Sequence, residues 1–451
     1  MEQGVFTVLF EVPSPVRNET ISASSAHLKS LEDAIINVTK IETGLAITDK
    51  IRAKETWNPA DFANILDNSQ KNKHIIFISG KGLKLSAMPE VIERCKSSGF
   101  QNLVPVTGDL LTNEDKRNSP CYTDSIYTLN MISERNDSGF FYPGCVVNPF
   151  KYTPSSIYPQ YYKLIKKLKK GASFIISQAG WDMVKLQELR WYLEMREMHY
   201  PLIFRMLLLT PEMAEDIMSG KKPGYYMSCD LANILKKESK YGITQFASAQ
   251  WRRLQIQAAG AKLMGCSAVM ISGVELPEHA RIVCQRISEA LDEFKTFDDW
   301  KLAYLNYLAR ADMAPYPNRF YVFENLFTRQ NPELKNMAAG PPAKCSDMEK
   351  KKFRISKKLF RNANLRFAGE QLLAKKILTK CPGCSYCRLP LTHYICPETC
   401  PKGLANGPCG GTQTDALCEN KKNECIHSKQ FRIASWKKSL DTIEERFIRS
   451  I

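Results

Sequence analysis

Eight short β-rich runs, separated by segments of helical periodicity, dominate the first 300 residues of this 451-residue chain. Such alternation is typical of a parallel sheet whose strands are joined by crossover helices. Eight is the strand count of a closed barrel, so we predict an α/β fold of the (β/α)₈ (TIM barrel) type; an open doubly wound sheet is the alternative. The runs span residues 5–12, 44–48, 74–79, 103–108, 140–147, 173–178, 202–210 and 267–273.

The segments between and after these runs define the remaining organisation. A helical, aromatic-rich region is expected at residues 298–329, followed by a linker rich in Pro, Gly and Ala at residues 331–344. We therefore expect a barrel domain at 1–300, a helical connector and linker at 301–344, and a small cysteine-rich iron-sulfur domain at 345–451. The helices predicted within the barrel span residues 86–97, 159–170, 183–197 and 243–263.

The C-terminal quarter differs chemically from the rest of the chain. Residues 341–451 contain 22 Lys and Arg against 10 Asp and Glu, although the whole chain carries a net charge of only +16. No apolar stretch approaches the roughly 20 residues that cross a bilayer, and the N-terminus lacks the features of a secretory signal. We therefore expect a cytoplasmic protein that does not insert into a membrane.

Eight of the 15 cysteines lie within 45 residues near the C-terminus. Three thiolates at three-residue spacing can wrap one inorganic cubane, so the block predicts the ligands of two 4Fe-4S clusters. A zinc site that also uses His393 or His427 is the alternative, and a disulfide framework does not suit the reducing cytoplasm. The predicted metal ligands are Cys381, Cys384, Cys387, Cys396, Cys400, Cys409, Cys418 and Cys425.

Polar residues close several of the apolar runs, where a (β/α)₈ barrel carries its chemistry. Glu11 is the most informative, because a carboxylate within an apolar strand is costly to bury unless it is paired or protonated. Asp109 follows the fourth run, and we expect a functional role for both carboxyl groups. Thr48, Gln178 and Arg205 end or lie within other runs; for Thr48 and Arg205 a purely structural role is the alternative.

Four segments carry a family resemblance. LFEVPSP (residues 9–15) resembles the F-E-x-x-P opening of methylenetetrahydrofolate reductase, and VPVTGD (104–109) resembles that family's strand ending in Arg-Gly-Asp. GASFIISQAGWD (171–182) resembles its A-G-A-x-x-x-I-T-Q segment. ICPETCPKGLANGPCGG (395–411) is similar to the iron-sulfur partner protein of the acetogen-type enzyme. The chain thus resembles the flavin-dependent reductase barrel fused to that partner.

The resemblance implies reduction of 5,10-methylenetetrahydrofolate to 5-methyltetrahydrofolate by a flavin, FAD or FMN, with electrons relayed through the iron-sulfur clusters. It assigns the general acid to Glu11, for which an apolar surround that keeps the carboxyl protonated would be suitable. Asp109 would act beside the flavin ring, and Gln178 with Arg205 would bind the folate. The cofactor-binding residues that it implies are Thr48, Thr107, Gly108, Asp109, Lys166 and Lys167.

Departures from the family pattern fall at flavin-pocket positions. The third run ends IIFISGKG where the family has His-Leu-Thr-Cys, and Thr107 replaces the Arg before Gly-Asp. The family's Glu and His after the fifth strand are replaced in YPGCVVNPF (142–150). We therefore expect the flavin to be held differently, with the Gly-Lys-Gly turn at residues 80–82 contacting phosphate.

Two other function classes remain open at this stage. A flavin-free, pterin-dependent methyl or one-carbon transferase would keep the barrel, whereas a zinc-containing basic protein that binds nucleic acid would explain the C-terminal charge. Under the leading hypothesis the partners are a folate substrate and an acidic electron carrier, such as a ferredoxin or a redox partner subunit, and no nucleic acid. The carrier would dock on the basic residues 350–380, and we expect an oligomer.

Overall fold

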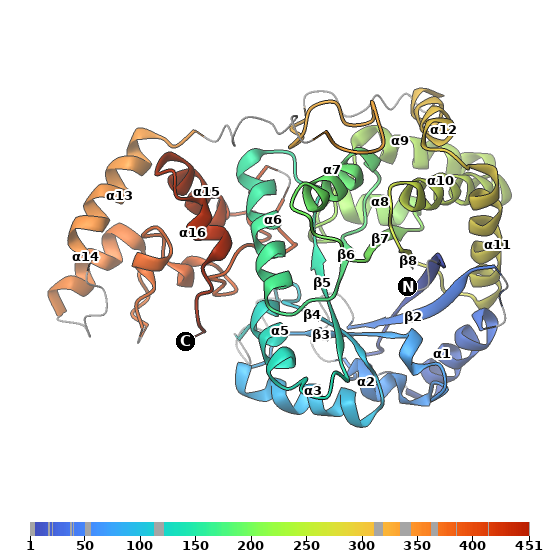
Figure 1. Ribbon diagram of the computed structural model, residues 1–451, viewed down its shortest axis with the longest axis horizontal. Coiled ribbons are helices and arrows are strands. Elements are labelled where there is room, and N and C mark those ends of the chain that lie inside the picture. The colour runs from blue at the N-terminus through green and yellow to red at the C-terminus, as the bar shows by residue number, and fades with distance from the viewer. Residues whose placement is uncertain are drawn as a thin grey trace.

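Eight parallel strands close in chain order into a barrel, in which β1 pairs with both β2 and β8 (Figure 1). The computed structural model describes residues 5–16, 19, 21–36, 38, 40–49, 56–111, 121–310, 319–333, 344–361, 369–384, 386–413 and 415–450. The predicted (β/α)₈ fold is therefore confirmed, and the open-sheet alternative is wrong. The strands are β1 (Thr7–Pro13), β2 (Glu42–Thr48), β3 (Ile75–Ser79), β4 (Asn102–Val106), β5 (Tyr142–Val147), β6 (Phe174–Ser177), β7 (Leu202–Leu207) and β8 (Ala268–Ser272).

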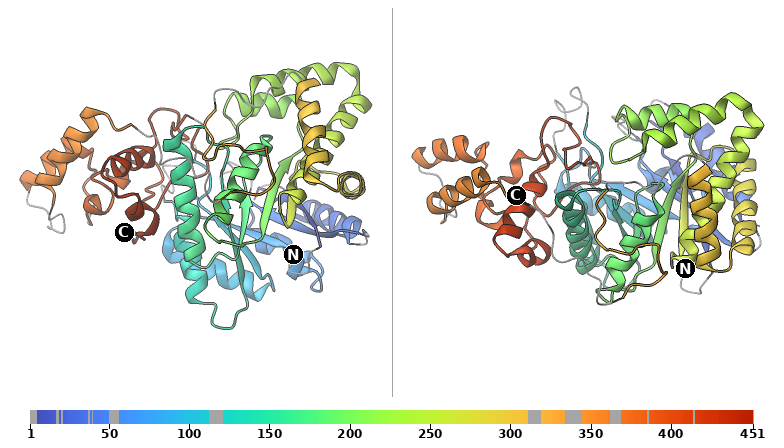
Figure 2. Two further views of the ribbon diagram at one scale, coloured as in Figure 1. Left: turned by 45° about the horizontal axis from the view of Figure 1, so that its top comes forward. Right: turned by 90° about the horizontal axis from the view of Figure 1, so that it is seen from above.

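Helices surround the barrel, and the C-terminal helices extend from one side of it (Figure 2). The four helices predicted within the barrel correspond to α3, α6, α7 and α10. The bounds are α1 (Ile21–Ile35), α2 (Pro59–Phe62), α3 (Met88–Ser97), α5 (Ser125–Glu134), α6 (Pro154–Lys169), α7 (Met183–Glu194), α8 (Pro211–Met218), α9 (Cys229–Glu238), α10 (Ile243–Leu263), α11 (Pro277–Glu293), α12 (Phe297–Arg310), α13 (Asp347–Leu359), α14 (Gly369–Thr379), α15 (Ile426–Trp436) and α16 (Leu440–Glu445).

Helix α6 begins five residues before the predicted start. Thr153 and Ser156 form a capping box there, and Pro154 occupies the first helical position, where its missing N–H costs nothing. Pro159, which the sequence suggested as the start, lies inside the helix instead. Gln160 and Lys163 lie on this helix together with the predicted basic pair, Lys166 and Lys167.

The expectation of a helix throughout residues 298–329 is wrong in its second half. Helix α12 ends at Arg310, and residues 319–333 form irregular chain against α7. The Val322 N–H donates to the Glu188 carboxylate (2.6 Å), and Trp191 Nε1 donates to the Gln330 carbonyl (2.9 Å). The aromatic residues of this segment pack against several helices: Phe323 contacts Trp191 on α7, and Phe327 contacts Trp300 and Tyr304 on α12. Most of the predicted linker, residues 334–343, lies outside the described residues.

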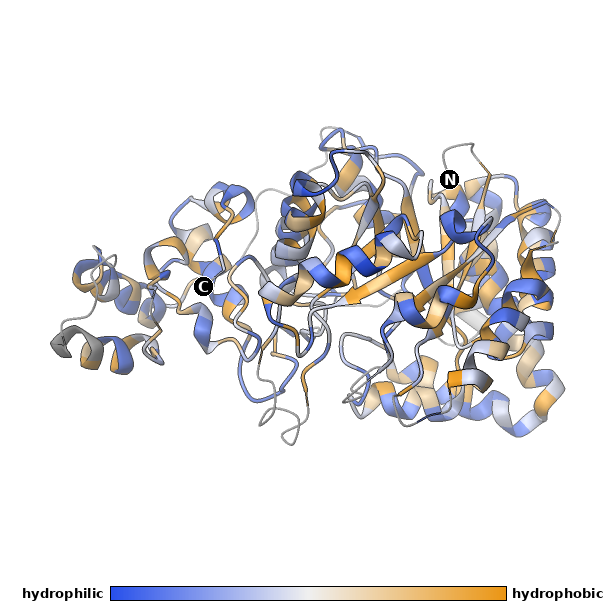
Figure 3. Cartoon of the chain, turned by 90° about the horizontal axis from the view of Figure 1, so that it is seen from below, coloured by the Kyte–Doolittle hydropathy of each residue, from blue (hydrophilic) through white to orange (hydrophobic). Residues whose placement is uncertain are grey.

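The alternation of side chains along the strands positions the site. Successive strand residues point to opposite faces, and in a barrel every second residue points inward. The inward side chains form an apolar interior, and the strands are accordingly the most hydrophobic elements in Figure 3. Polar side chains stand two residues after these apolar ones and also point inward, so they close the carboxyl end of the barrel. These are Glu11, Thr48, Gln178, Arg205 and Ser272.

The C-terminal helices attach to the barrel through α6. Helices α15 and α16 lie beside α6, whereas α13 and α14 lie farther out (Figure 1). The rings of Tyr158 on α6 and Phe431 on α15 stack at 5.5 Å between centroids. None of the described helices combines the length and apolar composition required to cross a membrane.

Candidate active site

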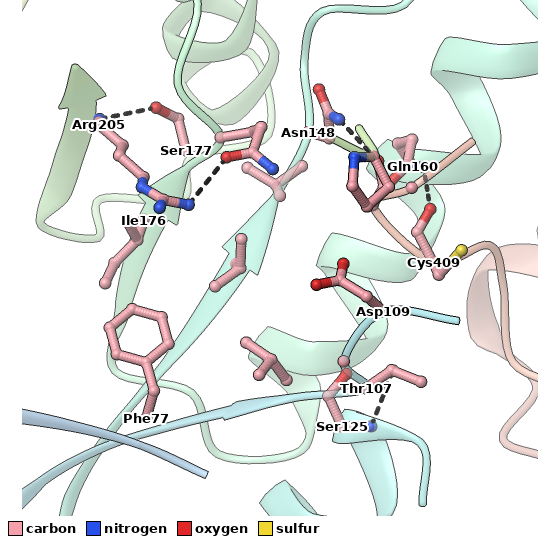
Figure 4. A pocket seen from close by; sticks show the side chains of 18 of the residues that line it. Phe77, Thr107, Asp109, Ser125, Asn148, Gln160, Ile176, Ser177, Arg205 and Cys409 are labelled. Carbon is pink, nitrogen blue, oxygen red and sulfur yellow. Dashed lines mark hydrogen bonds between the residues drawn. The ribbon is translucent and has the colours of Figure 1, made fainter. Parts of the chain in front are cut away.

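A single hydrogen-bond network connects the polar residues at the barrel's carboxyl end. The Glu11 carboxylate accepts from Arg205 Nε (3.0 Å), from Arg205 Nη2 and from the Ser272 hydroxyl. Thr48 Oγ1 donates to the other Glu11 oxygen at 3.4 Å. Arg205 Nη1 donates to Gln178 Oε1 at 3.0 Å, as Figure 4 shows. The structure therefore brings together Glu11, Thr48, Gln178 and Arg205, four of the residues chosen from the sequence.

Glu11 does not lie in the apolar surround that an acid role would favour, because its carboxylate is paired with the Arg205 guanidinium and hydrogen-bonded to Ser272. Burial disfavours the charge on Arg205, but the adjacent Glu11 carboxylate raises its pKa above the ordinary value. Both side chains are largely buried, with 12% of Glu11 and 15% of Arg205 exposed. A carboxyl group held this way is a hydrogen-bond acceptor. For Glu11 to donate a proton, the ion pair must first be opened.

Asp109 is the acidic group of the pocket whose titration is most altered. It lies in the loop after β4, and its carboxyl points into the pocket (Figure 4). Burial raises its pKa to about 6, a shift that Lys402 opposes and Glu419 reinforces. A carboxyl group that titrates near neutral pH can exchange a proton with a bound ligand. Asp109 is therefore suited to proton exchange within this pocket.

Thr107 and Gly108 shape the loop that carries Asp109. Thr107 Oγ1 accepts from the Ser125 N–H (3.4 Å) at the start of α5. Gly108 has φ +81°, and a Cβ there would lie 2.6 Å from the Lys81 Cβ, so a larger residue would not fit. In the predicted phosphate turn at residues 80–82, the Lys81 ammonium forms an ion pair with Asp49 at 3.0 Å.

A loop from the cysteine block, residues 406–411, covers this end of the barrel. Asn148 Nδ2 donates to the Gly410 carbonyl and Gln160 Nε2 to the Cys409 carbonyl, both at 2.8 Å. Glu419 accepts from the Leu110 N–H (2.7 Å), one residue after Asp109. The loop encloses a cavity of about 170 Å³ that Cys409 lines together with the strand-end residues. Sequence reasoning missed this placement, because the block predicted only a metal-binding module.

A second cavity, of about 700 Å³, lies against the same ion pair. Glu11, Thr48, Arg205 and Tyr225 line both cavities, so the ion pair separates them. The volume lies in the range of about 300–1,000 Å³ that is typical of ligand pockets. Tyr225 was not predicted, since it lies in the segment between α8 and α9 and no strand pattern marks it. The walls of the larger cavity also include His27, Leu31, Phe62, Met213, Lys222 and Val274.

The basic pair on α6 does not lie on a solvated helix face. Both side chains are buried beneath the C-terminal segment. The Lys166 ammonium donates to the Asn406 carbonyl (3.4 Å), and that of Lys167 donates to the Val146 carbonyl (2.7 Å). Lys167 also lines the smaller cavity. Both ammonium groups donate hydrogen bonds to backbone carbonyl groups of the protein. Contact of this pair with flavin phosphate stays a prediction.

All fifteen cysteines are free thiols. Within the described part of the chain, no three His, Cys, Asp or Glu side chains are gathered closely enough to hold a metal ion. His393 and His427, the possible zinc ligands, contact Ser439 (3.2 Å) and Gln430 (3.1 Å) through ring nitrogens. The thiol-only donor set suits an iron-sulfur cluster by its chemistry, although binding would require the sulfurs to move together.

The eight thiols nevertheless divide into two sets by their electrostatic interactions. The outer set consists of Cys381, Cys384, Cys387 and Cys396, which interact with one another. The inner set consists of Cys400, Cys409, Cys418 and Cys425, which likewise interact with one another. Of the two, the inner set adjoins the barrel, because it includes Cys409.

Two family models match the chain. Residues 1–213 match the model described as Methylenetetrahydrofolate reductase, and residues 360–450 match Methylene-tetrahydrofolate reductase C terminal. Both models describe parts of methylenetetrahydrofolate reductase, and together they match about two thirds of the chain. The chain is an oxidoreductase of that type, which confirms the resemblance of the barrel segments to the reductase. The resemblance of residues 395–411 to the iron-sulfur partner protein stays a prediction.

Solved structures also resemble this chain. An uncharacterized protein from Clostridium thermocellum that binds two copies of 5-methyl-5,6,7,8-tetrahydrofolic acid is 16% identical to this chain, with a TM-score of 0.44. That match covers 64% of this chain and 95% of the other. No curated protein matches the chain.

Proposed function

We propose that this chain reduces 5,10-methylenetetrahydrofolate to 5-methyltetrahydrofolate, with a flavin and the folate in the two adjoining cavities. The observation that carries the proposal is the convergence of Glu11, Asp109, Gln178 and Arg205 at the barrel's carboxyl end, in a chain whose residues 1–213 match the reductase model. The reaction adds two electrons and two protons to the folate. A reduced flavin, when bound, supplies the hydride, so the chain's own residues must supply the remaining proton.

Glu11 is the proposed proton donor to the folate nitrogen whose protonation opens the five-membered ring. In the free protein its carboxylate is paired with Arg205, so we propose that the bound folate displaces this pair. Gln178 accepts from Arg205 at 3.0 Å and is placed to hold the guanidinium once Glu11 leaves it. The partner exchange would keep the Arg205 charge hydrogen-bonded while Glu11 becomes able to carry a proton.

Asp109 is the proposed acidic group near the flavin ring. Its pKa of about 6 lets it hold or release a proton near neutral pH, and Gly108 keeps its loop close to β3. Thr48 lines both cavities and is placed to contact either ligand. His27 and Lys222 are basic residues of the larger cavity, and we propose them as the flavin phosphate contacts in place of Lys166 and Lys167.

The cysteine block would supply electrons through two iron-sulfur clusters, one for each set of four thiols. The outer set lies near α13, whose basic residues are exposed to solvent. That face is suited to an acidic electron carrier such as a ferredoxin. Arg432 fixes α13 to the cysteine block, because it pairs with both Glu349 on α13 and Glu424.

Anaerobic purification followed by flavin, iron and acid-labile sulfide analysis tests this assignment. We expect one flavin per chain, with iron and sulfide in equal amounts, and turnover of methylenetetrahydrofolate when a reductant is supplied. Bound zinc without sulfide would refute the cluster assignment. Methyl transfer without any flavin would refute the reductase assignment itself.

A further inference from the structure

Five lysines are buried around the loop at residues 406–411. Their exposed fractions are 8% or less, although lysines are almost never buried in proteins unless they are paired. Three belong to α6, one precedes that helix, and one lies in the cysteine block. We refer to Lys151, Lys163, Lys166, Lys167 and Lys402 as the lysine cage.

Only two members of the lysine cage have a carboxylate partner among the described residues. Lys163 pairs with Asp124 at 2.8 Å, and Lys402 pairs with Glu419 at 2.5 Å. The other three donate to backbone carbonyl groups: Lys151 to Thr412 and Gly410, Lys166 to Asn406, and Lys167 to Val146. Three cage lysines therefore lack a carboxylate partner among the described residues, although their side chains are buried and Lys163, Lys167 and Lys402 also line the smaller cavity.

Burial of unpaired positive charge is unfavourable, and the lysines respond as expected. Desolvation, with repulsion from Lys163, lowers the pKa of Lys166 to about 7 and that of Lys167 to about 8. Desolvation also lowers the pKa of Lys151 to about 8. An anionic group beside these lysines would remove the imbalance.

The inner set of thiols is the nearest candidate to hold such a group. Lys151 interacts electrostatically with Cys409 and Cys425, and both Lys167 and Lys402 interact with Cys409. The backbone of the same loop is fixed by the cage, since Lys163 donates to the Gly407 carbonyl at 3.2 Å. Thiolates and the clusters that they hold carry negative charge, so the inner set would provide the missing charge.

We propose that the lysine cage is the charge partner of an anionic iron-sulfur centre held by Cys400, Cys409, Cys418 and Cys425, and that it raises the reduction potential of that centre. The inference rests on the proposed function, which supplies the two clusters. A reduced cluster carries one more negative charge than an oxidised one, so adjacent positive charge favours the reduced form. The inner centre, beside the cavity of Asp109, would then hold an electron more readily than the outer one.

The test is a redox titration of the anaerobically isolated full chain, followed by electron paramagnetic resonance. Lys151→Met and Lys167→Met each remove one cage charge, whereas Lys151→Arg retains it. Lys169→Met is the matched control, because Lys169 is exposed on the same helix. For each Met variant of the cage we expect at least a tenfold loss of the reduced form of one centre at fixed potential, which is 59 mV for a one-electron couple. The reduction potential of the other centre should not change. In Lys151→Arg and Lys169→Met, both potentials should stay at their wild-type values.

Several outcomes would overturn the inference. Unchanged reduction potentials of both centres in Lys151→Met and Lys167→Met, with wild-type iron content and melting temperature, would refute this inference but not the proposed function. Loss of flavin affinity without a change in either potential would show that the lysines bind flavin phosphate instead. Wild-type protein that contains no iron would refute the cluster part of the proposed function together with this inference. If one Met variant fails to fold, the other and the Lys151→Arg comparison still decide the question.

Discussion

Replacing Glu11 with Gln tests the proposed proton donor. The variant keeps the shape of the side chain but removes its charge and its proton, so Arg205 loses its carboxylate partner. Loss of one member of a buried ion pair costs about 3–5 kcal/mol. Because both side chains remain 12–15% exposed, we expect a cost somewhat below this range, about 2–3 kcal/mol, and a melting temperature lower by about 5 °C. Folate reduction should fall by about 10² or more, the usual contribution of a positioned general acid.

The assay separates the two half-reactions. Reduction of the flavin by an artificial donor should proceed at the wild-type rate in Glu11→Gln, while oxidation of the reduced flavin by methylenetetrahydrofolate should be slow. Glu278→Gln is the matched control, because Glu278 is an exposed carboxylate that lines neither cavity. It should leave both half-reactions unchanged. Near-normal folate reduction by Glu11→Gln would refute the assignment of the acid.

Three further predictions follow from the site. The pKa of Asp109 is raised from 3.8 to about 6. The proton on Asp109 therefore stabilises the folded protein at low pH, and this stabilisation is lost as the pH rises through about 6. The melting temperature of the wild type should fall over this range, and the fall should be smaller in Asp109→Asn. Cys409→Ala should weaken flavin binding as well as lower iron content, whereas Cys384→Ala should lower iron content alone, because only Cys409 lines the barrel cavity; equal effects on flavin would contradict this. Reversing the exposed charges of α13 should slow electron transfer from reduced ferredoxin at low salt, but not from a small uncharged dye. The residues to be changed to Glu are Lys351, Lys352, Lys357 and Lys358. An unchanged rate with ferredoxin would exclude docking on α13.

The barrel was predictable from sequence because its signals are local. Apolar runs define strands, and parity along a strand fixes which side chains point inward, so Glu11 and Gln178 could be placed at the carboxyl end before any coordinates. The partner of Glu11 was not predictable in the same way. Arg205 lies 194 residues away on β7, and only closure of the barrel brings the two groups within hydrogen-bonding distance.

The seating of the cysteine block on the barrel also has no local signal. From the sequence, the cysteines of residues 381–425 were predicted to bind a metal, and Lys166 and Lys167 to bind a cofactor. Each interpretation considered one segment alone. The contact between them depends on Gln160 and Lys163 meeting the loop's carbonyl groups, which only the folded chain shows. The irregular segment at residues 319–333 was mispredicted for the same reason, because its contacts with α7 override its helical pattern.

A single-turnover experiment tests the central claim, that one chain couples the cysteine block to folate reduction in the barrel. Anaerobic protein is reduced to completion, freed of excess reductant and mixed with 5,10-methylenetetrahydrofolate. The account predicts one 5-methyltetrahydrofolate for each two electrons stored, with simultaneous reoxidation of flavin and iron-sulfur signals. Reoxidation of neither signal, or product formed by protein that contains neither flavin nor iron, would contradict it.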